Sequence, residues 1–330
     1  MNPLQFSLLL PDEGKYAEWM NQTVEPYLST LRKDGFFVSE NGAELYYFSL
    51  IPPNPLGSVV IVHGFTESAE KYNEMCYWFL QMGYAVFALD QRGHGKSFRT
   101  SEDFALTDVE HFYDYVTDLH HFMEDIVIPS SGNLPLFLYG HSMGGAVSVL
   151  YLQDHPECFS KAILTGPMLK PKTSGYPSFF ARTVSAGFRL FGKGGDRVFA
   201  YKPGFDENEL FKNSPATSEP RFEYYRRKRV AFRHLQNTYP SYRWLNESLR
   251  IVKTLLNPKR CARVQTPTLL FSAGNDTFVY RKEQEQFISQ IPHGQIVYKE
   301  RARHEIYLSP NDIMAGYLSE IEGFLKSGKV

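Results

Sequence analysis

Short, wholly apolar segments alternate with longer helical patterns along most of this chain, and no other feature constrains its fold as tightly. The runs at residues 59–62 and 84–89 are continuously apolar, as expected for strands that are buried on both faces. The segments between such runs carry apolar residues three and four positions apart, which is typical of amphipathic helices. The pattern predicts an α/β fold with a mostly parallel sheet covered by helices. The candidate strands are residues 44–50, 59–63, 85–90, 136–139, 162–165, 268–272 and 295–299.

The alternation stops after Pro167 and resumes at Pro267, so the chain contains an insertion between these two points. The first part of the chain is polar and carries one amphipathic patch, which we expect to pack on the core. A role at a membrane surface is the alternative for this patch. The predicted organisation is an N-terminal extension over residues 1–35, a core over residues 36–168 and 265–330, and a mainly helical insertion over residues 169–264.

Charge is distributed unevenly along the chain, although the net charge is only −1 at pH 7. The near-neutral total gives no electrostatic reason to expect a nucleic-acid partner. Residues 168–262 carry 19 lysines and arginines against 7 acidic residues, whereas the rest of the chain carries 16 against 29. A basic insertion on an acidic core requires a physical explanation.

Cysteine content and hydropathy narrow the class of protein further. Cys76, Cys158 and Cys261 are too few and too scattered for a disulfide framework or a zinc site, and no metal or organic cofactor is expected. No uncharged apolar run reaches the roughly 18 residues needed to span a bilayer. The apolar stretch 6–10 is short and has no basic segment before it, which argues against a signal peptide. We expect a cytoplasmic protein whose contact with the inner membrane face, if any, is peripheral.

Residues 140–144 read Gly-His-Ser-Met-Gly and match the G-x-S-x-G pattern of a nucleophile elbow. The pattern follows a strand-like segment and precedes a helical one, which is the context that such an elbow requires. A serine held at a strained turn needs neighbours without a Cβ atom, and the two glycines provide them. We therefore predict Ser142 as the nucleophile; the alternative is an ordinary helix cap.

Enzymes with this elbow place the acid and then the histidine after the serine in the chain. A catalytic histidine must follow the C-terminal end of a strand, because sites gather at that edge of an open α/β sheet. His293 precedes the last predicted strand, whereas His304 follows it, so His304 is the predicted general base. Asp276 follows the preceding strand and is the predicted acid. The alternatives are a surface histidine and a turn-closing aspartate.

The backbone N–H groups of Met143 and Phe65 are the predicted oxyanion donors. Met143 follows the nucleophile, and Phe65 lies in the loop after the third strand. Gly64 lets that loop approach the nucleophile closely. For the His63 ring, we favour a core or hydrogen-bonding role over chemistry.

Four segments resemble the monoacylglycerol lipase and lysophospholipase branch of the α/β hydrolases, a group also called serine aminopeptidases. They are residues 62–65, 90–97, 140–145 and 302–305. The last segment, together with residues 91–93, most resembles the bacterial lysophospholipases. The resemblance covers about residues 40–167 and 266–326, and it does not reach the insertion.

This resemblance implies an α/β-hydrolase fold with a mostly parallel eight-stranded sheet, helices on both faces and a helical cap inserted after strand 6. It also implies hydrolysis of single-chain glycerolipid esters through an acyl-enzyme. Ser142, Asp276 and His304 match the triad of the family, and Phe65 and Met143 match its oxyanion donors. The loop at residues 92–95 is structural in the family, so no catalytic role is assigned to His94. The chain departs from the family at residues 307–309, where an acidic residue is more typical.

The insertion is rich in aromatic residues as well as basic ones, and residues 226–229 form its densest run of charge. One interpretation of this run is a solvated face of a helical cap. The sharper hypothesis is a lid that faces an anionic membrane or a phosphate-bearing substrate, with aromatic residues lining an acyl-chain pocket. Neutral monoacylglycerol gains little from such charge, which favours a lysophospholipid.

Three other functions stay open. An aminopeptidase would need a carboxylate in the cap to bind a free amine, and Glu219, Glu223 and Glu247 are available. A carboxylesterase of small esters would use the same triad. The third alternative is not an enzyme but a non-catalytic binding protein on the same scaffold. The intact set of triad residues argues against it.

Overall fold

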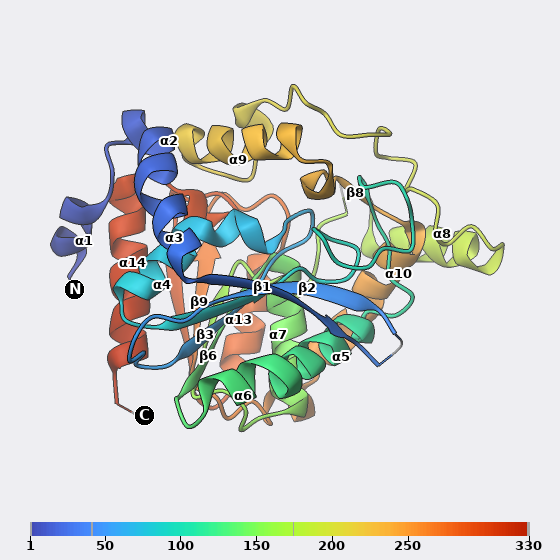
Figure 1. The fold of residues 1–330 in the computed structure, drawn as a ribbon. Coiled ribbons are helices and arrows are strands. Elements are labelled where there is room, and N and C mark those ends of the chain that lie inside the picture. The colour runs from blue at the N-terminus through green and yellow to red at the C-terminus, as the bar shows by residue number, and fades with distance from the viewer. Residues whose placement is uncertain (1, 41, 174, 329–330) are drawn as a thin grey trace.

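One large sheet forms the centre of the molecule in the computed structural model, which describes residues 2–40, 42–173 and 175–328 (Figure 1). Its eight strands run in the order β1-β2-β4-β3-β6-β7-β9-β10, and only the pairs β1–β2 and β2–β4 are antiparallel. The predicted mostly parallel, eight-stranded sheet is therefore confirmed. The strands are β1 (Arg32–Val38), β2 (Glu44–Leu50), β3 (Ser58–Val62), β4 (Ala85–Leu89), β6 (Leu136–His141), β7 (Lys161–Thr165), β9 (Thr268–Ala273) and β10 (Gly294–Lys299).

Strand register brings two pairs of loops together at the carboxyl edge of this sheet. Val62 at the end of β3 pairs with Gly140 near the end of β6, so the loops that follow these two strands emerge side by side. Ala273 at the end of β9 pairs with Lys299 at the end of β10, which places their following loops together as well. This edge is where open α/β sheets assemble their sites.

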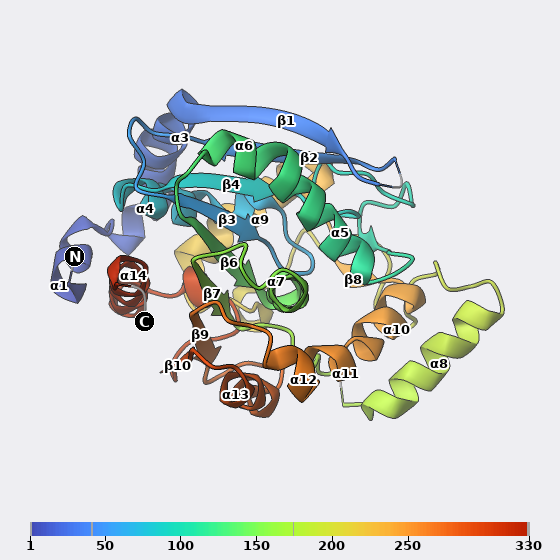
Figure 2. The ribbon, with the colours of Figure 1, turned by 90° about the horizontal axis from the view of Figure 1, so that it is seen from below.

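Helices cover both faces of the sheet, as Figure 2 shows from a second direction. Alternate residues of a buried strand point to opposite faces, so Val59 and Ile61 of β3 join one core and Val60 and Val62 the other. The first core contains α4 (Asn73–Gln81) and α14 (Asn311–Lys326). The second contains α5 (Tyr113–Phe122), α7 (Ser142–Asp154) and α13 (Arg281–Gln290), with the one-turn helices α6 (Ile128–Ser131), α11 (Val252–Leu255) and α12 (Pro258–Cys261) nearby.

The N-terminal part of the chain folds onto the first core. Its helices are α1 (Pro3–Leu9), α2 (Tyr16–Trp19) and α3 (Glu25–Leu31). Tyr16, Met20 and Val24 of the amphipathic patch are all buried there. The next strand, β1, was not among the candidate strands, and the predicted boundary at residue 35 falls inside it. An edge strand with a mostly exposed face carries no continuous apolar run, so its sequence resembles an extension.

Between β7 and β9 the chain forms α8 (Ser178–Leu190), α9 (Glu219–Ala231) and α10 (Tyr242–Arg250). In Figure 1, α9 lies beside the N-terminal helices, whereas α8 projects from the other end of the molecule next to α10. A short parallel pair, β5 (Leu106–Thr107) and β8 (Tyr239–Pro240), ties this segment to the core.

Ion pairs between the insertion and the rest of the chain account for the uneven charge. Basic residues of the insertion meet carboxylates of the core and of the N-terminal helices, so the two opposite charge excesses face one another. The pairs are Arg221–Glu74, Lys228–Glu25, Arg243–Asp108 and Arg189–Glu110.

Candidate active site

Ser142 stands at the sharp junction of β6 and α7, with a φ of 50° that non-glycine residues rarely adopt. Gly144 is required because a Cβ atom there would lie 2.1 Å from the carbonyl oxygen of Val62. A Cβ atom at Gly140 would lie 2.4 Å from the Ser148 hydroxyl. The two glycines of the motif thus allow α7 to pack against β3 and β6 while Ser142 stays in its strained conformation.

The structure brings Ser142, His304 and Asp276 into one hydrogen-bonded chain. His304 Nε2 lies 2.8 Å from Ser142 Oγ, and His304 Nδ1 lies 2.6 Å from Asp276 Oδ2. Asp276 lies in the loop after β9, and His304 lies in the loop after β10. With its proton on Nδ1 facing the carboxylate, the imidazole presents Nε2 as an acceptor for the serine hydroxyl.

Electrostatics within this chain favour a charged acid and a basic histidine. Burial raises the pKa of Asp276, but the facing His304 and the backbone N–H groups of Phe278 and Val279 outweigh burial, so the net pKa is lowered. Burial lowers the pKa of His304, but the Asp276 carboxylate and Glu305 outweigh it, so the net pKa is raised. Asp276 therefore stays ionised, and the imidazolium form of His304 is stabilised when it accepts a proton.

The two predicted oxyanion donors lie on the loops that the sheet register brings together. Met143 is the residue after Ser142 in the first turn of α7, and Phe65 is in the loop after β3 and lines the cavity of Ser142. This loop contains a second strained residue, Thr66, with a φ of 61°. The Gly64 N–H donates to Glu67 Oε2 at 2.6 Å, which holds the loop in place.

His63 has a hydrogen-bonding role in the core, as favoured from the sequence. Its Nε2 accepts from the Gln91 N–H at 2.9 Å, so its Nδ1 carries the proton and donates to the Gly64 carbonyl at 2.7 Å. Burial lowers the pKa of His63, which keeps the ring neutral. The ring therefore fixes the loop that carries Phe65.

A buried polar network lies behind Ser142, His304 and Asp276, and it was not predicted from the sequence. Glu67 accepts hydrogen bonds from Tyr72 at 2.6 Å, Tyr307 at 2.5 Å and Lys71 at 3.0 Å. Lys71 also pairs with Glu305, the neighbour of His304. Burial raises the pKa of Glu305 to about 7, although Lys71 opposes this shift. Glu67, Lys71 and Tyr72 lie in one segment between β3 and α4, whereas Glu305 and Tyr307 follow β10, so only the contacts between the two segments reveal the whole network.

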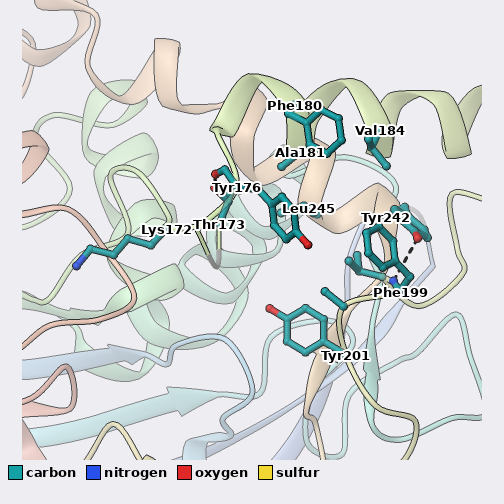
Figure 3. Close-up of a pocket in the computed structure, with 12 residues that line it drawn as sticks. Lys172, Thr173, Tyr176, Phe180, Ala181, Val184, Phe199, Tyr201, Tyr242 and Leu245 are labelled. Carbon is teal, nitrogen blue, oxygen red and sulfur yellow. Dashed lines mark hydrogen bonds between the residues drawn. The ribbon is translucent and has the colours of Figure 1, made fainter.

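The Ser142 cavity adjoins two pockets of opposite character. An apolar pocket under α8 shares Lys172, Tyr201 and Leu245 with it. Figure 3 shows Phe180, Ala181 and Val184 of α8 on one side of this apolar pocket, facing Leu245 and Tyr201. A polar pocket against α9 shares other residues with the Ser142 cavity: Thr66, Pro215, Phe278 and Glu305.

The basic run at residues 226–229 is largely neutralised inside the chain. Arg226 pairs with Glu223, Lys228 with Glu25 and Arg229 with Glu209, whereas Arg227 is exposed. This run therefore does not form a continuous face of unpaired cations.

A metal-binding cluster and a membrane-spanning helix are both absent from the residues that the structure describes. Within residues 2–40, 42–173 and 175–328, no group of three or more histidines, cysteines, aspartates or glutamates is placed to hold a metal ion. Cys76, Cys158 and Cys261 are free thiols. No helix in this described part of the chain is both long and apolar enough to cross a membrane.

Known structures share this fold. A carboxyl esterase from Bacillus coagulans superposes with a TM-score of 0.70 at 22% identity, covering 89% of this chain and 97% of that one. A soluble variant of monoglyceride lipase from Saccharomyces cerevisiae gives a TM-score of 0.69 at 21% identity, covering 88% of this chain and 94% of that one. These likenesses confirm the α/β-hydrolase fold.

Sequence relatives point to one family. Lysophospholipase L2 of Escherichia coli is 40% identical over 126 residues, so the match spans 38% of this chain and only 36% of that protein. Probable lysophospholipase L2 of Haemophilus influenzae is 24% identical over 296 residues, or 88% of this chain and 91% of that protein. The family described as "Serine aminopeptidase, S33" matches residues 53–311. Because that match spans most of the chain, the protein belongs to the serine aminopeptidase S33 family of hydrolases.

Proposed function

We propose that this protein is a serine hydrolase that cleaves the carboxylic ester of single-chain glycerolipids, either a lysophospholipid or a monoacylglycerol. The observation that carries this proposal is the hydrogen-bonded chain Ser142–His304–Asp276, with 2.8 Å and 2.6 Å between its atoms. A nucleophile, a base and an acid in this order form the machinery of acyl transfer.

The proposed reaction has two half-reactions. Ser142 Oγ attacks the ester carbonyl while its proton moves to His304 Nε2, and the Phe65 and Met143 N–H groups stabilise the oxyanion. The C–O bond to the glycerol then breaks, and His304 returns the proton to the departing alcohol. Water, deprotonated by His304, attacks the acyl-enzyme; the bond between the acyl carbon and Ser142 Oγ breaks, His304 returns the proton to Oγ, and the fatty acid leaves. Asp276 holds the imidazole tautomer and stabilises its charged form throughout.

The two pockets fit the two products of such a reaction. The apolar pocket under α8 is lined by aromatic and aliphatic side chains, including Phe180, Val184 and Leu245, and suits an acyl chain. The polar pocket against α9 suits the alcohol that leaves. The names of two relatives support the two substrate classes in turn: lysophospholipase L2 of Escherichia coli, and a monoacylglycerol lipase of Mycolicibacterium smegmatis that is 31% identical over 147 residues.

An aminopeptidase is the second candidate, because the family description names that activity. Such an enzyme needs a carboxylate near the scissile bond to bind a free amine. The three cap carboxylates considered for this role, Glu219, Glu223 and Glu247, are not among the residues that line the Ser142 cavity. The carboxylates that do line it, Glu67 and Glu305, are both paired with Lys71. Glu247 is instead buried against Arg189 and Arg250. The lipid ester therefore fits the site better.

The expected contact with an anionic membrane, at the inner face in a cytoplasmic protein, is proposed here for α8 rather than for residues 226–229. α8 contains no acidic residue, and Phe179, Leu190 and Phe191 are exposed along it and at its end. An apolar helix face bordered by cations is typical of segments that lie in a membrane interface.

The test is release of fatty acid or amine from four substrates by the wild type and by Ser142→Ala. The substrates are 1-acyl-lysophosphatidylcholine, lysophosphatidylglycerol, monoacylglycerol and an aminoacyl anilide. Loss of the nucleophile should reduce turnover on the order of 10⁶-fold. Lipid hydrolysis that disappears in Ser142→Ala supports the proposal. Cleavage of the anilide alone would identify a peptidase, and inertness on all four would favour a binding protein.

A further inference from the structure

The polar pocket against α9 differs in chemistry from the rest of the site. It has a volume of about 390 Å³ and opens onto the Ser142 cavity through Thr66, Phe278 and Glu305, which line both. An alcohol that leaves the carbonyl at Ser142 can therefore extend into this pocket. Its walls carry charged groups of both signs, whereas the apolar pocket has no carboxylate in its lining.

The charges in this polar pocket are arranged by depth. Lys71, Arg229 and Arg226 have side chains that are 8%, 13% and 23% exposed. The side chain of Glu209 is more open, at 29%, and Asp206 is an exposed residue. Apart from Glu305 beside the triad, the cations thus lie deeper and the carboxylates lie nearer the rim.

Both arginines are already in ion pairs, Arg226 with Glu223 and Arg229 with Glu209, so the pocket offers fixed ion pairs rather than free cations. Arg226 is fixed by Glu223 and by the Glu207 carbonyl, and Arg229 by Glu209 and the carbonyls of Leu235 and Asn237. These contacts engage all three guanidinium nitrogens of each arginine, so two of the five N–H donors in each rigid fork, one on Nη1 and one on Nη2, are not used by them. Little further ordering is then needed when an anion binds.

On the basis of the ester hydrolysis proposed above, we propose that this polar pocket binds a zwitterionic glycerophospho head group, with the phosphate at Arg226 and Arg229 and the ammonium at Glu209 and Asp206. In such a head group the phosphate lies between the glycerol and the amine. That order matches cations placed inside and carboxylates placed at the rim. A bare glycerol head group has neither charge and gains nothing from the arrangement.

The experiment compares kcat/KM for lysophosphatidylethanolamine, lysophosphatidylglycerol and monoacylglycerol that carry the same acyl chain. The wild type should prefer lysophosphatidylethanolamine over monoacylglycerol by about 10-fold or more, since charged hydrogen bonds contribute at this level. Arg226→Gln should reduce that ratio about 10-fold, and Arg226→Lys should restore part of it. Glu209→Gln should reduce the ratio of kcat/KM for lysophosphatidylethanolamine to kcat/KM for lysophosphatidylglycerol. Arg227→Gln, on the same helix but exposed, is the matched control and should leave every ratio unchanged.

Two results would overturn the assignment. Equal rates on monoacylglycerol and lysophosphatidylethanolamine in the wild type would show that the pocket does not select the charged head group. A ratio that Arg226→Gln and Arg226→Lys both leave unchanged would show that the arginine does not contact the phosphate. In either case lipid hydrolysis persists. Failure of the proposed function itself is different, because no lipid then releases fatty acid.

Discussion

The helices α8 and α9 are each 13 residues long and belong to the same insertion, yet their burial is the reverse of their composition. α8 is the more apolar, but Ser185 is its only buried residue. α9 is dense in charge, but it buries Arg221, Phe222 and Tyr225. Burial therefore follows the available partners rather than hydropathy. Basic residues of α9 pair with carboxylates of the core and of the N-terminal helices, whereas α8 contacts mainly α10. One helix is a fixed wall of the site, and the other presents an apolar face outward.

The fixed wall depends on a buried ion pair. Arg221 is fully buried and donates two hydrogen bonds of 2.9 Å to Glu74 of α4, which also accepts from Tyr16 at 2.8 Å. This contact joins α9, the core and the N-terminal helices at one point. On α8, Arg189 makes a comparable pair with Glu247, but its side chain is 33% exposed.

Removing the buried arginine should give the largest effect in the molecule outside the triad. Arg221→Met leaves Glu74 charged and without its guanidinium partner, which should lower the free energy of unfolding by about 3–5 kcal/mol. Arg189→Met on α8 is the matched variant and should cost about 1 kcal/mol or less, because the Arg189 side chain is partly solvated and Glu247 keeps its second partner, Arg250. Denaturant unfolding measures both.

A double variant separates the charge from the packing. Arg221→Met combined with Glu74→Leu replaces the whole pair by apolar groups and should recover much of the lost stability. If Arg221→Met and Arg189→Met destabilise equally, α9 is no more anchored than α8, and the contrast between the two helices is wrong.

The exposed face of α8 should matter for substrate access and hardly at all for stability. Phe179 and Phe191 are 74% and 80% exposed. Replacing both with serine should change the free energy of unfolding by no more than about 0.5 kcal/mol. Hydrolysis of substrate in anionic vesicles should fall roughly 10-fold, because apolar contact with the lipid is lost. Rates on a short soluble ester provide the reference.

The control is Val38→Ser, at an exposed apolar position on the edge strand β1. It changes surface hydropathy without touching α8 and should leave vesicle hydrolysis as it is. If the double variant with Phe179→Ser and Phe191→Ser hydrolyses substrate in vesicles as fast as the wild type, α8 does not contact the membrane.

The same contrast explains how far the sequence could predict the structure. Local sequence patterns indicate which residues are buried. The continuous apolar runs therefore predicted β3 and β4, and the glycines around Ser142 predicted the turn that holds it. The choice of His304 over His293 needed only the position of β10, which begins at Gly294. Both rest on short-range order along the chain.

What could not be predicted depends on contacts between distant segments. Glu74 is separated from Arg221 by 147 positions, and Glu25 from Lys228 by 203, so no local pattern links them. Residues 226–229 consequently looked like a free cationic face. The link from Glu67 and Lys71 to Glu305 was missed for the same reason, although it connects the loop of Phe65 with the loop of His304.

The smallest expected effect is a shift in the pH dependence of activity. It again distinguishes the side of the site next to α9 from the side next to α8. The α9 side holds Glu305, whose pKa is raised to about 7 mainly by burial, whereas the lining of the α8 pocket contains no carboxylate. Ionised Glu305 helps to raise the pKa of His304, and the proposed mechanism needs His304 unprotonated to accept the serine proton. Glu305→Gln removes this charge, so His304 loses its proton at lower pH.

The acidic limb of kcat/KM on a small ester should therefore move to lower pH in Glu305→Gln. The movement is limited because Glu305 is itself partly protonated across that limb, so only its ionised fraction acts on His304. Glu300→Gln, in the same loop but exposed, is the control and should leave the profile in place. A limb that stays fixed in Glu305→Gln, or moves to higher pH, would mean that the charge of Glu305 does not contribute to the basicity of His304.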